Sequence, residues 1–310
     1  MNLDNIMTTH LKKGKYLPAD EKIYQCIIYV FVTLVLLITI VPLIYVVSMS
    51  LTSQQEIINN GGRYVMFPKQ VSFSGYEYLI NGGWMWNALF ISFSRAIVGT
   101  GVTLLFTSLG AYVLSNVDLP GRTILVLMVL ITVLFGVGLI PSYLLITSLK
   151  LKDNFLVYII PAMVDTWSLL VLKQFMEQIP ESLKESARID GANDLQIYGL
   201  IYMPLSRPSL AAIGLFAAVG HWNSWFDAFI YVQKSTLWPF QLVLRNVLQG
   251  VLQMTDMSNF SSEQLSLMNR VNGDSLKMAA VIVGTLPILC VYPFLQKHFT
   301  KGMLVGSVKG

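Results

Sequence analysis

The sequence predicts an all-α, polytopic membrane protein with six transmembrane helices and both termini in the cytoplasm. Of its 310 residues, 54% are hydrophobic and only 12% are charged, and the mean hydropathy is +0.61. A soluble domain carries roughly 25% charged residues, so this chain has too few polar groups to cover a soluble surface. The composition also excludes a disordered chain and a disulfide scaffold. A net charge of +4 is too small and dispersed to indicate nucleic-acid binding.

Six apolar runs are candidates for membrane spans, because a spanning helix needs about 20 mostly apolar residues. The fourth run is the shortest and contains Pro161 and Asp165. We expect each run to form one helix. The runs cover residues 23–49, 88–114, 123–146, 155–172, 209–232 and 278–295.

Basic residues set the expected orientation. Four lysines precede the first run, and the positive-inside rule places such a segment in the cytoplasm. Six spans then return the C-terminus to the cytoplasm, with 12 Lys and Arg residues on the inner side and 9 on the outer side. The predicted parts are an inner segment 1–22, a membrane region 23–298 with outer loops 51–87 and 233–277 and an inner loop 173–208, and an inner tail 299–310.

The chain lacks the motifs of a self-contained enzyme. It has no GxxxxGK[ST] phosphate loop and no HExxH sequence. Its three histidines, His10, His221 and His298, are far apart along the chain. We therefore predict no catalytic residue, no metal ligand and no cofactor bound by this chain.

The predicted inner loop begins with a short amphipathic helix. Pro180 is suited to open it, and Lys184, Glu185 and Arg188 are expected to lie on its charged side. Gly191 permits a sharp turn with positive φ at its end.

A second helix is expected after this glycine. Asp194 is suited to cap its start, and Pro204 and Pro208 are expected to end it where the fifth run begins. The two helices together predict a rigid amphipathic knob at the inner membrane face.

The residues of this knob resemble the EAA loop of ABC importer permeases. The typical pattern is EAAxxDGA, followed after a fixed gap by PLxxP. Residues 185–192 have the sequence ESARIDGA, and residues 204–208 have PLSRP. The departure is Ser186, which stands where the family has its second alanine.

Two further motifs follow in order. Residues 222–226, WNSWF, look like the WNxF element of the sugar-importer branch, with an added aromatic at Trp225. The tail 299–310 is glycine-rich, ends in Lys-Gly, and looks like the tail of MalG-type subunits. The chain therefore resembles a carbohydrate permease subunit of an ABC importer. Its hydrophilic stretch before the sixth run is similar to the LplC/YtcP-like branch, often tied to complex or uronate-containing oligosaccharides.

The resemblance implies transport by alternating access. In the family, two permease subunits form the pathway, two ABC ATPase subunits dock beneath them, and an extracellular sugar-binding lipoprotein delivers the substrate. This chain would then form half of an oligosaccharide pathway in a bacterial plasma membrane, as a heterodimer with a second permease. ATP and Mg²⁺ would be held by the ATPase partners, and no nucleic acid would be involved.

The resemblance also implies roles for residues of the inner loop and the tail. Glu185 would make the polar contact in the ATPase cleft, Asp190 would brace the turn, and the two prolines would transmit motion into the fifth span. The implied coupling residues are Glu185, Ala187, Asp190, Gly191, Ala192, Pro204 and Pro208. The tail residues implied to enter the interface between the ATPases are Gly302, Gly306, Lys309 and Gly310.

Polar and aromatic residues inside the spans are candidates for the sugar pathway. A sugar needs hydrogen bonds and an apolar face to stack on, and polar groups inside a span are costly and therefore functional candidates. Asp165 either accepts bonds from sugar hydroxyls or pairs with Arg95. The aromatic candidates are equally compatible with an interfacial belt. The candidates are Asp165, Trp167, Trp222, Asn223, Trp225, Asp227 and Tyr231.

A secondary sugar transporter is the alternative function. Such a transporter also uses carboxylates and aromatic residues in the middle of its spans. It would normally be longer, with repeated halves, and would have no reason to contain an EAA-like knob.

Overall fold

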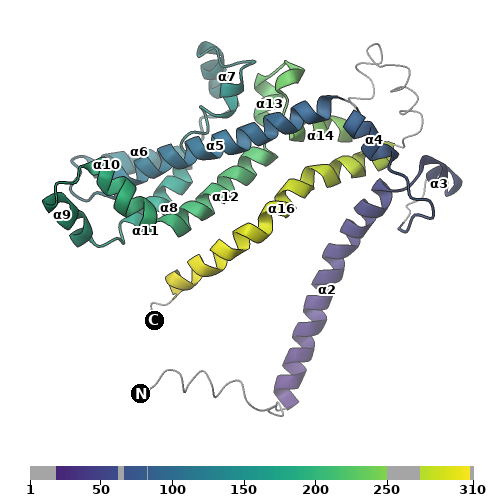
Figure 1. Cartoon of the computed structure of the whole chain (residues 1–310), viewed down its shortest axis with the longest axis horizontal. Helices are drawn as coiled ribbons and strands as arrows, with labels where there is room; N and C mark the ends of the chain where they lie inside the picture. Colours follow the sequence, from purple (N-terminus) through teal and green to yellow (C-terminus); the bar gives the residue numbers. More distant parts are fainter. Residues whose placement is uncertain (1–18, 62–65, 82, 250–272, 308–310) are drawn as a thin grey trace.

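The computed structural model describes residues 19–61, 66–81, 83–249 and 273–307 (Figure 1). Within these ranges the backbone forms helices and no strand, apart from one isolated β-bridge between Thr52 and Val71. The predicted all-α fold is therefore confirmed. The elements are α2 (Ala19–Ser50), α3 (Gln54–Asn59), α4 (Ser74–Asn81), α5 (Trp84–Ser115), α6 (Arg122–Leu134), α7 (Leu139–Ser148), η1 (Phe155–Tyr158), α8 (Thr166–Met176), α9 (Glu181–Ile189), α10 (Asp194–Ile197), η2 (Tyr198–Tyr202), α11 (Met203–Leu205), α12 (Arg207–Asn223), α13 (Phe226–Tyr231), η3 (Ser235–Leu237), α14 (Phe240–Leu248) and α16 (Gly273–Ser307).

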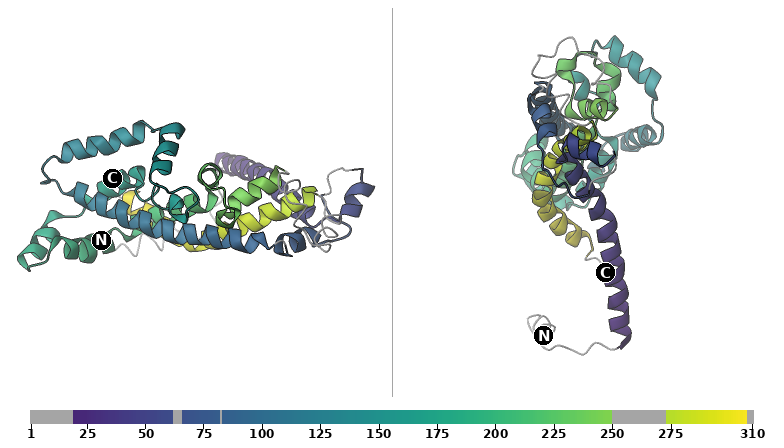
Figure 2. Two further views of the ribbon diagram at one scale, coloured as in Figure 1. Left: turned by 90° about the horizontal axis from the view of Figure 1, so that it is seen from above. Right: turned by 90° about the vertical axis from the view of Figure 1, so that its right-hand side faces the viewer.

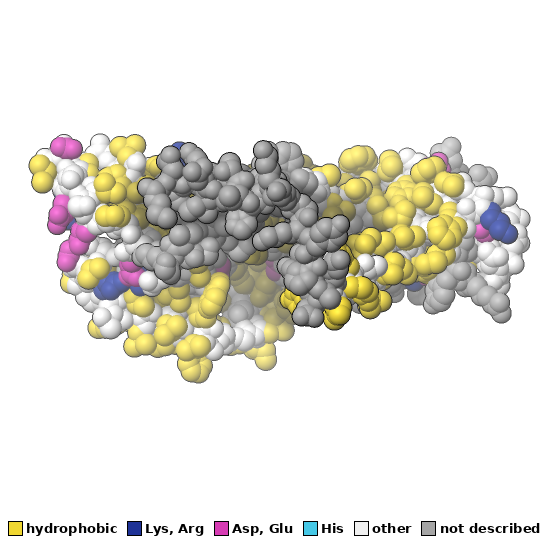
Figure 3. Space-filling model, turned by 90° about the horizontal axis from the view of Figure 1, so that it is seen from below, with side chains coloured by type: hydrophobic (Ala, Val, Ile, Leu, Met, Phe, Trp, Pro, Cys, Tyr) yellow, Lys and Arg dark blue, Asp and Glu magenta, His cyan; other side chains and the backbone are white. Residues whose placement is uncertain are grey.

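Three helices are long and apolar enough to cross a bilayer alone, namely Ile23–Ser50, Trp84–Ser115 and Gly273–Cys290. Two strongly bent helix pairs meet the same criterion when each pair is taken together, which gives up to five such spans in the described residues. In Figure 3, hydrophobic side chains make up much of the surface that is not drawn in grey, and charged side chains are visible at both ends of the molecule. This pattern fits a polytopic membrane protein, and the count of six spans stays a prediction.

Helix α5 is the central element of the bundle. It runs along the length of the molecule, and α12, α8 and α14 pack against it (Figure 1). Its buried face is a stripe of mostly small or polar side chains spaced three to four residues apart. Small side chains let membrane helices approach closely, so this stripe explains why α5 has several neighbours. The stripe includes Ala88, Ser92, Arg95, Gly99, Thr103, Thr107 and Ala111.

Residues 123–146 do not form the single helix that the sequence predicts. Helix α6 ends at Leu134, and α7 begins at Leu139 after a bend of 113°. Gly138, directly before α7, has a φ of 80°, a conformation that residues with a Cβ atom rarely adopt. The chain therefore turns a corner here, and the α6–α7 arch stands away from α5 in Figure 2.

The predicted fourth and fifth spans are interrupted as well. Residues 155–172 contain the short turn η1 and then α8, with irregular backbone around Pro161. The predicted fifth span is divided into α12 and α13 at Ser224 and Trp225. Irregular backbone at membrane depth is tolerated only where it is buried in protein or lines a cavity. These breaks therefore indicate where the functional site lies.

The first and last helices differ in how they join the bundle. Helix α16 begins five residues before the predicted sixth span and continues without interruption through Ser307, so the expected boundary between span and tail at residue 299 is not a helix end. Helix α2 contacts α16 but otherwise leans away from the bundle (Figure 1). None of the most apolar window of α2 is buried within this chain.

The close approach of α5 and α12 gives a test of the fold. A Cβ atom added at Gly99 would lie 2.5 Å from Nε2 of His221, whereas one added at Gly101 would meet nothing within 4 Å. We expect Gly99→Ala to destabilise the protein by about 1–3 kcal/mol through overpacking, and Gly101→Ala to be neutral or stabilising because alanine favours helix. Melting temperatures of the two variants in detergent would check this, and equal values would contradict the described packing.

Candidate functional site

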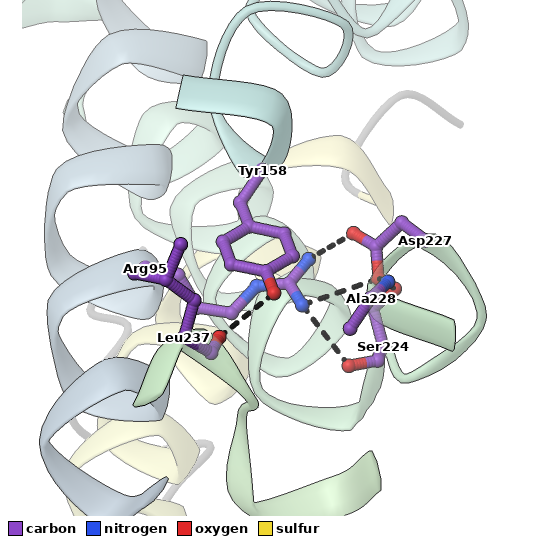
Figure 4. Close-up of polar contacts among 6 residues, drawn as sticks. All are labelled: Arg95, Tyr158, Ser224, Asp227, Ala228 and Leu237. Atoms are coloured by element: carbon purple, nitrogen blue, oxygen red, sulfur yellow. Dashed lines mark hydrogen bonds and ion pairs between the residues drawn. The ribbon is translucent and has the colours of Figure 1, made fainter. Parts of the chain in front are cut away.

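The centre of the candidate site is Arg95, a buried cation on α5. Its side chain is 2% exposed, and it lies 11 residues from the start of α5, or about 16 Å along the helix. Its Nη2 atom donates to Oδ2 of Asp227 at 2.5 Å, and its Nη1 atom donates to the backbone oxygen of Ser224 at 3.1 Å (Figure 4). Arg95 therefore holds together the break between α12 and α13.

Tyr158 of η1 forms one side of this site. The guanidinium carbon of Arg95 lies 4.4 Å from the centre of the Tyr158 ring, a cation–π geometry. The hydroxyl of Tyr158 donates to the backbone oxygen of Leu237 at 2.8 Å (Figure 4). Arg95 of α5 therefore contacts η1 and the α12–α13 break directly, and Tyr158 connects this site to η3.

The carboxylate of Asp227 is held as firmly as its partner. Besides the guanidinium, it accepts hydrogen bonds from the hydroxyl of Ser224 at 3.0 Å and from the backbone N–H of Ala228 at 2.8 Å. The Nε atom of Arg95 is buried and has no hydrogen-bond partner among the described residues. A buried ion pair is stable only when its remaining hydrogen-bonding groups are also satisfied, and this site meets that condition apart from Nε.

A cavity of about 390 Å³ adjoins the ion pair. Arg95 and Asp227 line one part of it, and Asp165 and His221 line another. Asp165 does not pair with Arg95, so that expectation was wrong. Instead, its carboxylate caps the start of α8, where it accepts hydrogen bonds from the backbone N–H and the hydroxyl of Ser168.

The predicted pathway residues do not all reach this cavity. Trp222 is only 4% exposed, packs on Phe93, and donates from Nε1 to the backbone oxygen of Gly284. It therefore joins α12 to α16 and faces no open space. Trp167 lines a separate cavity of about 400 Å³ beside α8.

The remaining candidates lie at the break or on either side of it: Asn223 ends α12, Trp225 precedes α13, and Tyr231 ends α13. Asn223 is exposed and accepts a hydrogen bond from Gln241. Trp225 packs under the guanidinium of Arg245 at 4.3 Å, and Tyr231 stacks on Tyr143. Of the seven predicted residues, the cavity therefore brings together Asp165 and Asp227.

The loops at this end are fixed by carboxylates that bind backbone N–H groups. Asp153 accepts from the N–H groups of Gln233 and Lys234, and Glu56 accepts from those of Lys69 and Gln70. These hydrogen bonds favour the charged form, so they lower the pKa of both carboxyls below the ordinary values.

The predicted knob lies at the opposite end of α5. Helix α9 begins directly after Pro180, and Gly191 has a φ of 86°, so both expectations for its ends are confirmed. The cap of α10 is Asn193, which forms a capping box with Gln196, and the expectation of Asp194 in that position was wrong. Asp194 instead pairs with Arg188.

The exposed surface of this knob contains the predicted contact residues. Glu185 and Asp190 are exposed, and Ala187 and Ala192 are partly buried against the core. Lys184, however, is 5% exposed, so the expected charged side of α9 is wrong at this residue. The second helix of the knob does not end simply at Pro204 and Pro208, as expected. A π-helical turn at Tyr198–Tyr202 precedes Pro204, and the chain then bends by 82° before α12. Pro208 is the second residue of α12.

Part of the predicted tail is described only as backbone. Gly302 and Gly306 belong to α16, so the chain is helical at both glycines. Lys309 and Gly310 lie outside the described residues.

Comparison with known proteins identifies the family. Residues 121–305 match the family of binding-protein-dependent transport system inner membrane components. The chain belongs to this family. It is therefore a multi-pass permease of a bacterial plasma membrane, and a secondary transporter is set aside.

Individual relatives place this permease more closely. The polygalacturonan/rhamnogalacturonan transport system permease protein YtcP of Bacillus subtilis (strain 168) is 38% identical over 290 residues, which cover 94% of this chain and 99% of that protein. Protein LplC of the same strain is 38% identical over 275 residues, covering 88% and 90%. The expected LplC/YtcP-like branch is thus confirmed.

A solved structure agrees with these sequence matches. The crystal structure of a bacterial ABC transporter involved in the import of the acidic polysaccharide alginate contains a chain with a TM-score of 0.82 and 27% identity to this permease. The match covers 92% of this chain and 100% of that one.

Several residues of the site are not among the candidates that the sequence predicts. Arg95 is predicted only as a partner for Asp165, although an arginine inside an apolar run is itself a signal of function. Tyr158, Ser224 and Lys184 gave no signal, because their importance depends on contacts between segments that are far apart in sequence.

The ion pair gives a test of the site. Arg95→Leu leaves the Asp227 carboxylate without its cation, and we expect the free energy of unfolding to fall by about 3 kcal/mol. This value is at the lower end of the range for breaking a buried ion pair, because the side chain of Asp227 is 25% exposed. The double variant Arg95→Leu/Asp227→Leu removes both charges and is expected to recover part of this loss. Thermal unfolding of the set in detergent measures the coupling, and strictly additive effects would contradict it.

Proposed function

We propose that this permease forms half of the translocation pathway of an oligosaccharide importer. Its partners are a second permease in a heterodimer, two ABC ATPase subunits that bind ATP and Mg²⁺, and an extracellular sugar-binding lipoprotein. The names of YtcP, as a permease for polygalacturonan and rhamnogalacturonan, and of the alginate import structure support a polysaccharide-derived substrate. The end of the molecule that contains α9 faces the cytoplasm in this proposal.

The observation that supports coupling is the geometry of α9. This short helix stands at one end of the bundle, with Glu185 and Asp190 exposed and Gly191 in the conformation that turns the chain back (Figure 1). Glu185 makes the polar contact with the ATPase in this proposal, and Ala187 and Ala192 keep the knob attached to the bundle.

Motion reaches the pathway through α12. The segment α10–α11 meets α12 at a bend of 82°. In this proposal, a tilt of the knob moves the segment α10–α11, and this segment in turn tilts α12. The far end of α12 is the break at Ser224, where Arg95 and Asp227 lie beside the cavity. Alternating access then consists of rearrangement of this break as the ATPase subunits close and open.

The charges of the cavity indicate which part of a sugar this chain contacts. Two carboxylates, Asp165 and Asp227, and one guanidinium line it. This balance suits sugar hydroxyls, because a uronate carboxylate would be repelled. If the substrate is acidic, its carboxylates are recognised by the second permease or the binding lipoprotein.

The coupling proposal is tested with Glu185→Ala in the assembled importer. We expect sugar-loaded binding protein to stimulate ATP hydrolysis by the wild type. In the variant, the stimulated rate is expected to be at least about tenfold lower, since truncating a buried charged contact costs about 2–5 kcal/mol. The control is Asp118→Ala, which removes an exposed carboxylate from the loop after α5.

Two results would count against the proposal. Stimulated hydrolysis by Glu185→Ala at the wild-type rate would show that Glu185 is not the coupling contact. Equal losses in both variants would show a general effect of surface charge rather than a specific contact.

A further inference from the structure

Helix α9 contains one buried side chain, and it belongs to a lysine. All nine residues of this helix are described, and among them only Lys184 is buried, with 5% of its surface exposed. Its Nζ atom donates to Oδ1 of Asn116 at 2.7 Å. The carboxylate of Glu181, on the same helix, is 4.0 Å away. Burying an ammonium is unfavourable unless its hydrogen bonds and charge are compensated, so this position of Lys184 needs an explanation.

The end of α5 supplies that compensation. Asn116 is the C-cap of α5, so the ammonium of Lys184 lies at the helix end that has a partial negative charge. The bond to Asn116 therefore combines a hydrogen bond with a favourable dipole interaction. It joins α9 to the residue that caps the central helix of the bundle.

The contact is a localised one. A cavity of about 190 Å³ lies between the end of α5 and the knob, and Asn116, Lys184, Tyr112 and Tyr202 line it. The cavity leaves α5 and α9 incompletely packed beside the hydrogen bond from Lys184 to Asn116, so this bond is a specific polar link between the two helices. The end of α5 is itself held, because Arg122 donates to the backbone oxygen of Leu114 and pairs with Glu177.

We propose that Lys184 is a positioning residue that links the coupling helix α9 to α5, so that α5 transmits part of the ATPase cycle to the Arg95–Asp227 pair. This proposal rests on the coupling role of α9. Arg95 and Asn116 are separated by 21 residues, or about 31 Å along the axis at 1.5 Å per residue. Helix α5 is continuous over nearly all of this length, whereas the covalent route through η2 and α11 contains a π-helical turn and a bend of 82°. Helix α5 is therefore the stiffer of the two connections.

The test uses Lys184→Met in the complete importer, which keeps the length of the side chain and removes its charge. We expect the ATPase subunits to remain bound and the basal hydrolysis rate to stay within about twofold, while the stimulated rate falls by about fivefold or more, a loss of about 1 kcal/mol of coupling. Lys184→Arg restores the hydrogen bond and is expected to recover most of the stimulation. The matched control is Lys150→Met, which removes an exposed cation from the turn after α7.

A second measurement tests whether Lys184 transmits the conformational change of the ATPase cycle to the far end of α5 or only holds the knob in position. Gln233→Cys, introduced after Cys26 and Cys290 are replaced by serine, reports on the exposed segment beyond α13. Its labelling by an impermeant maleimide in proteoliposomes is expected to change when the ATPase is trapped with a non-hydrolysable ATP analogue. In Lys184→Met this change is expected to be lost although the ATPase remains bound.

The outcomes are distinct from those of the coupling proposal. Wild-type stimulation and labelling in Lys184→Met would overturn the role of Lys184, whatever Glu185→Ala shows. Loss of the ATPase subunits from Lys184→Met would also overturn it, because Lys184 would then only support docking. A normal Glu185→Ala variant would instead remove the coupling role of α9 itself.

Discussion

The structure depends on the need to neutralise a guanidinium among helices that are otherwise apolar. Arg95 lies on the buried stripe of α5, where water is excluded, and it is compensated by Asp227, the backbone oxygen of Ser224 and the face of Tyr158. These groups come from separate segments, and two of them, Ser224 and Tyr158, lie where the chain departs from a regular α-helix. The break at Ser224 frees a backbone carbonyl that a continuous α12 would have used internally. Two of the interruptions that surround the cavity thus supply groups that compensate this one cation.

The sequence was sufficient for the class of fold and for the family. Composition predicted the membrane environment, and hydrophobic runs located both ends of α2 and α5 to within four residues and the start of α16 to within five, whereas the end of α16 lies twelve residues beyond the predicted run. The motif around Gly191 predicted the knob because its glycine and proline have strong local conformational preferences. Such features can be predicted because they depend on residues that are neighbours in the sequence, or on hydropathy that can be calculated from it.

The interruptions of the spans could not be predicted in the same way. Residues 123–146 and 209–232 are mostly apolar, and mean hydropathy does not distinguish a straight helix from one that turns at Gly138 or breaks at Ser224. The cap at Asn193 was missed because Asn and Asp have nearly equal preference for that position. Lys184 was placed on the wrong side of α9 because helical periodicity treats a lysine as exposed, and only the end of α5 makes its burial favourable.

Helix α2 has a consequence for how the protein is made. It contacts the bundle through α16, which lies at the other end of the chain. During synthesis, the first helix enters the membrane long before its intramolecular neighbour has emerged from the ribosome. It must therefore wait in lipid, or against another protein, while more than 200 residues are translated. Its mostly apolar surface suits it to lipid during this interval, and α16 can pack against α2 only after most of the chain has been made.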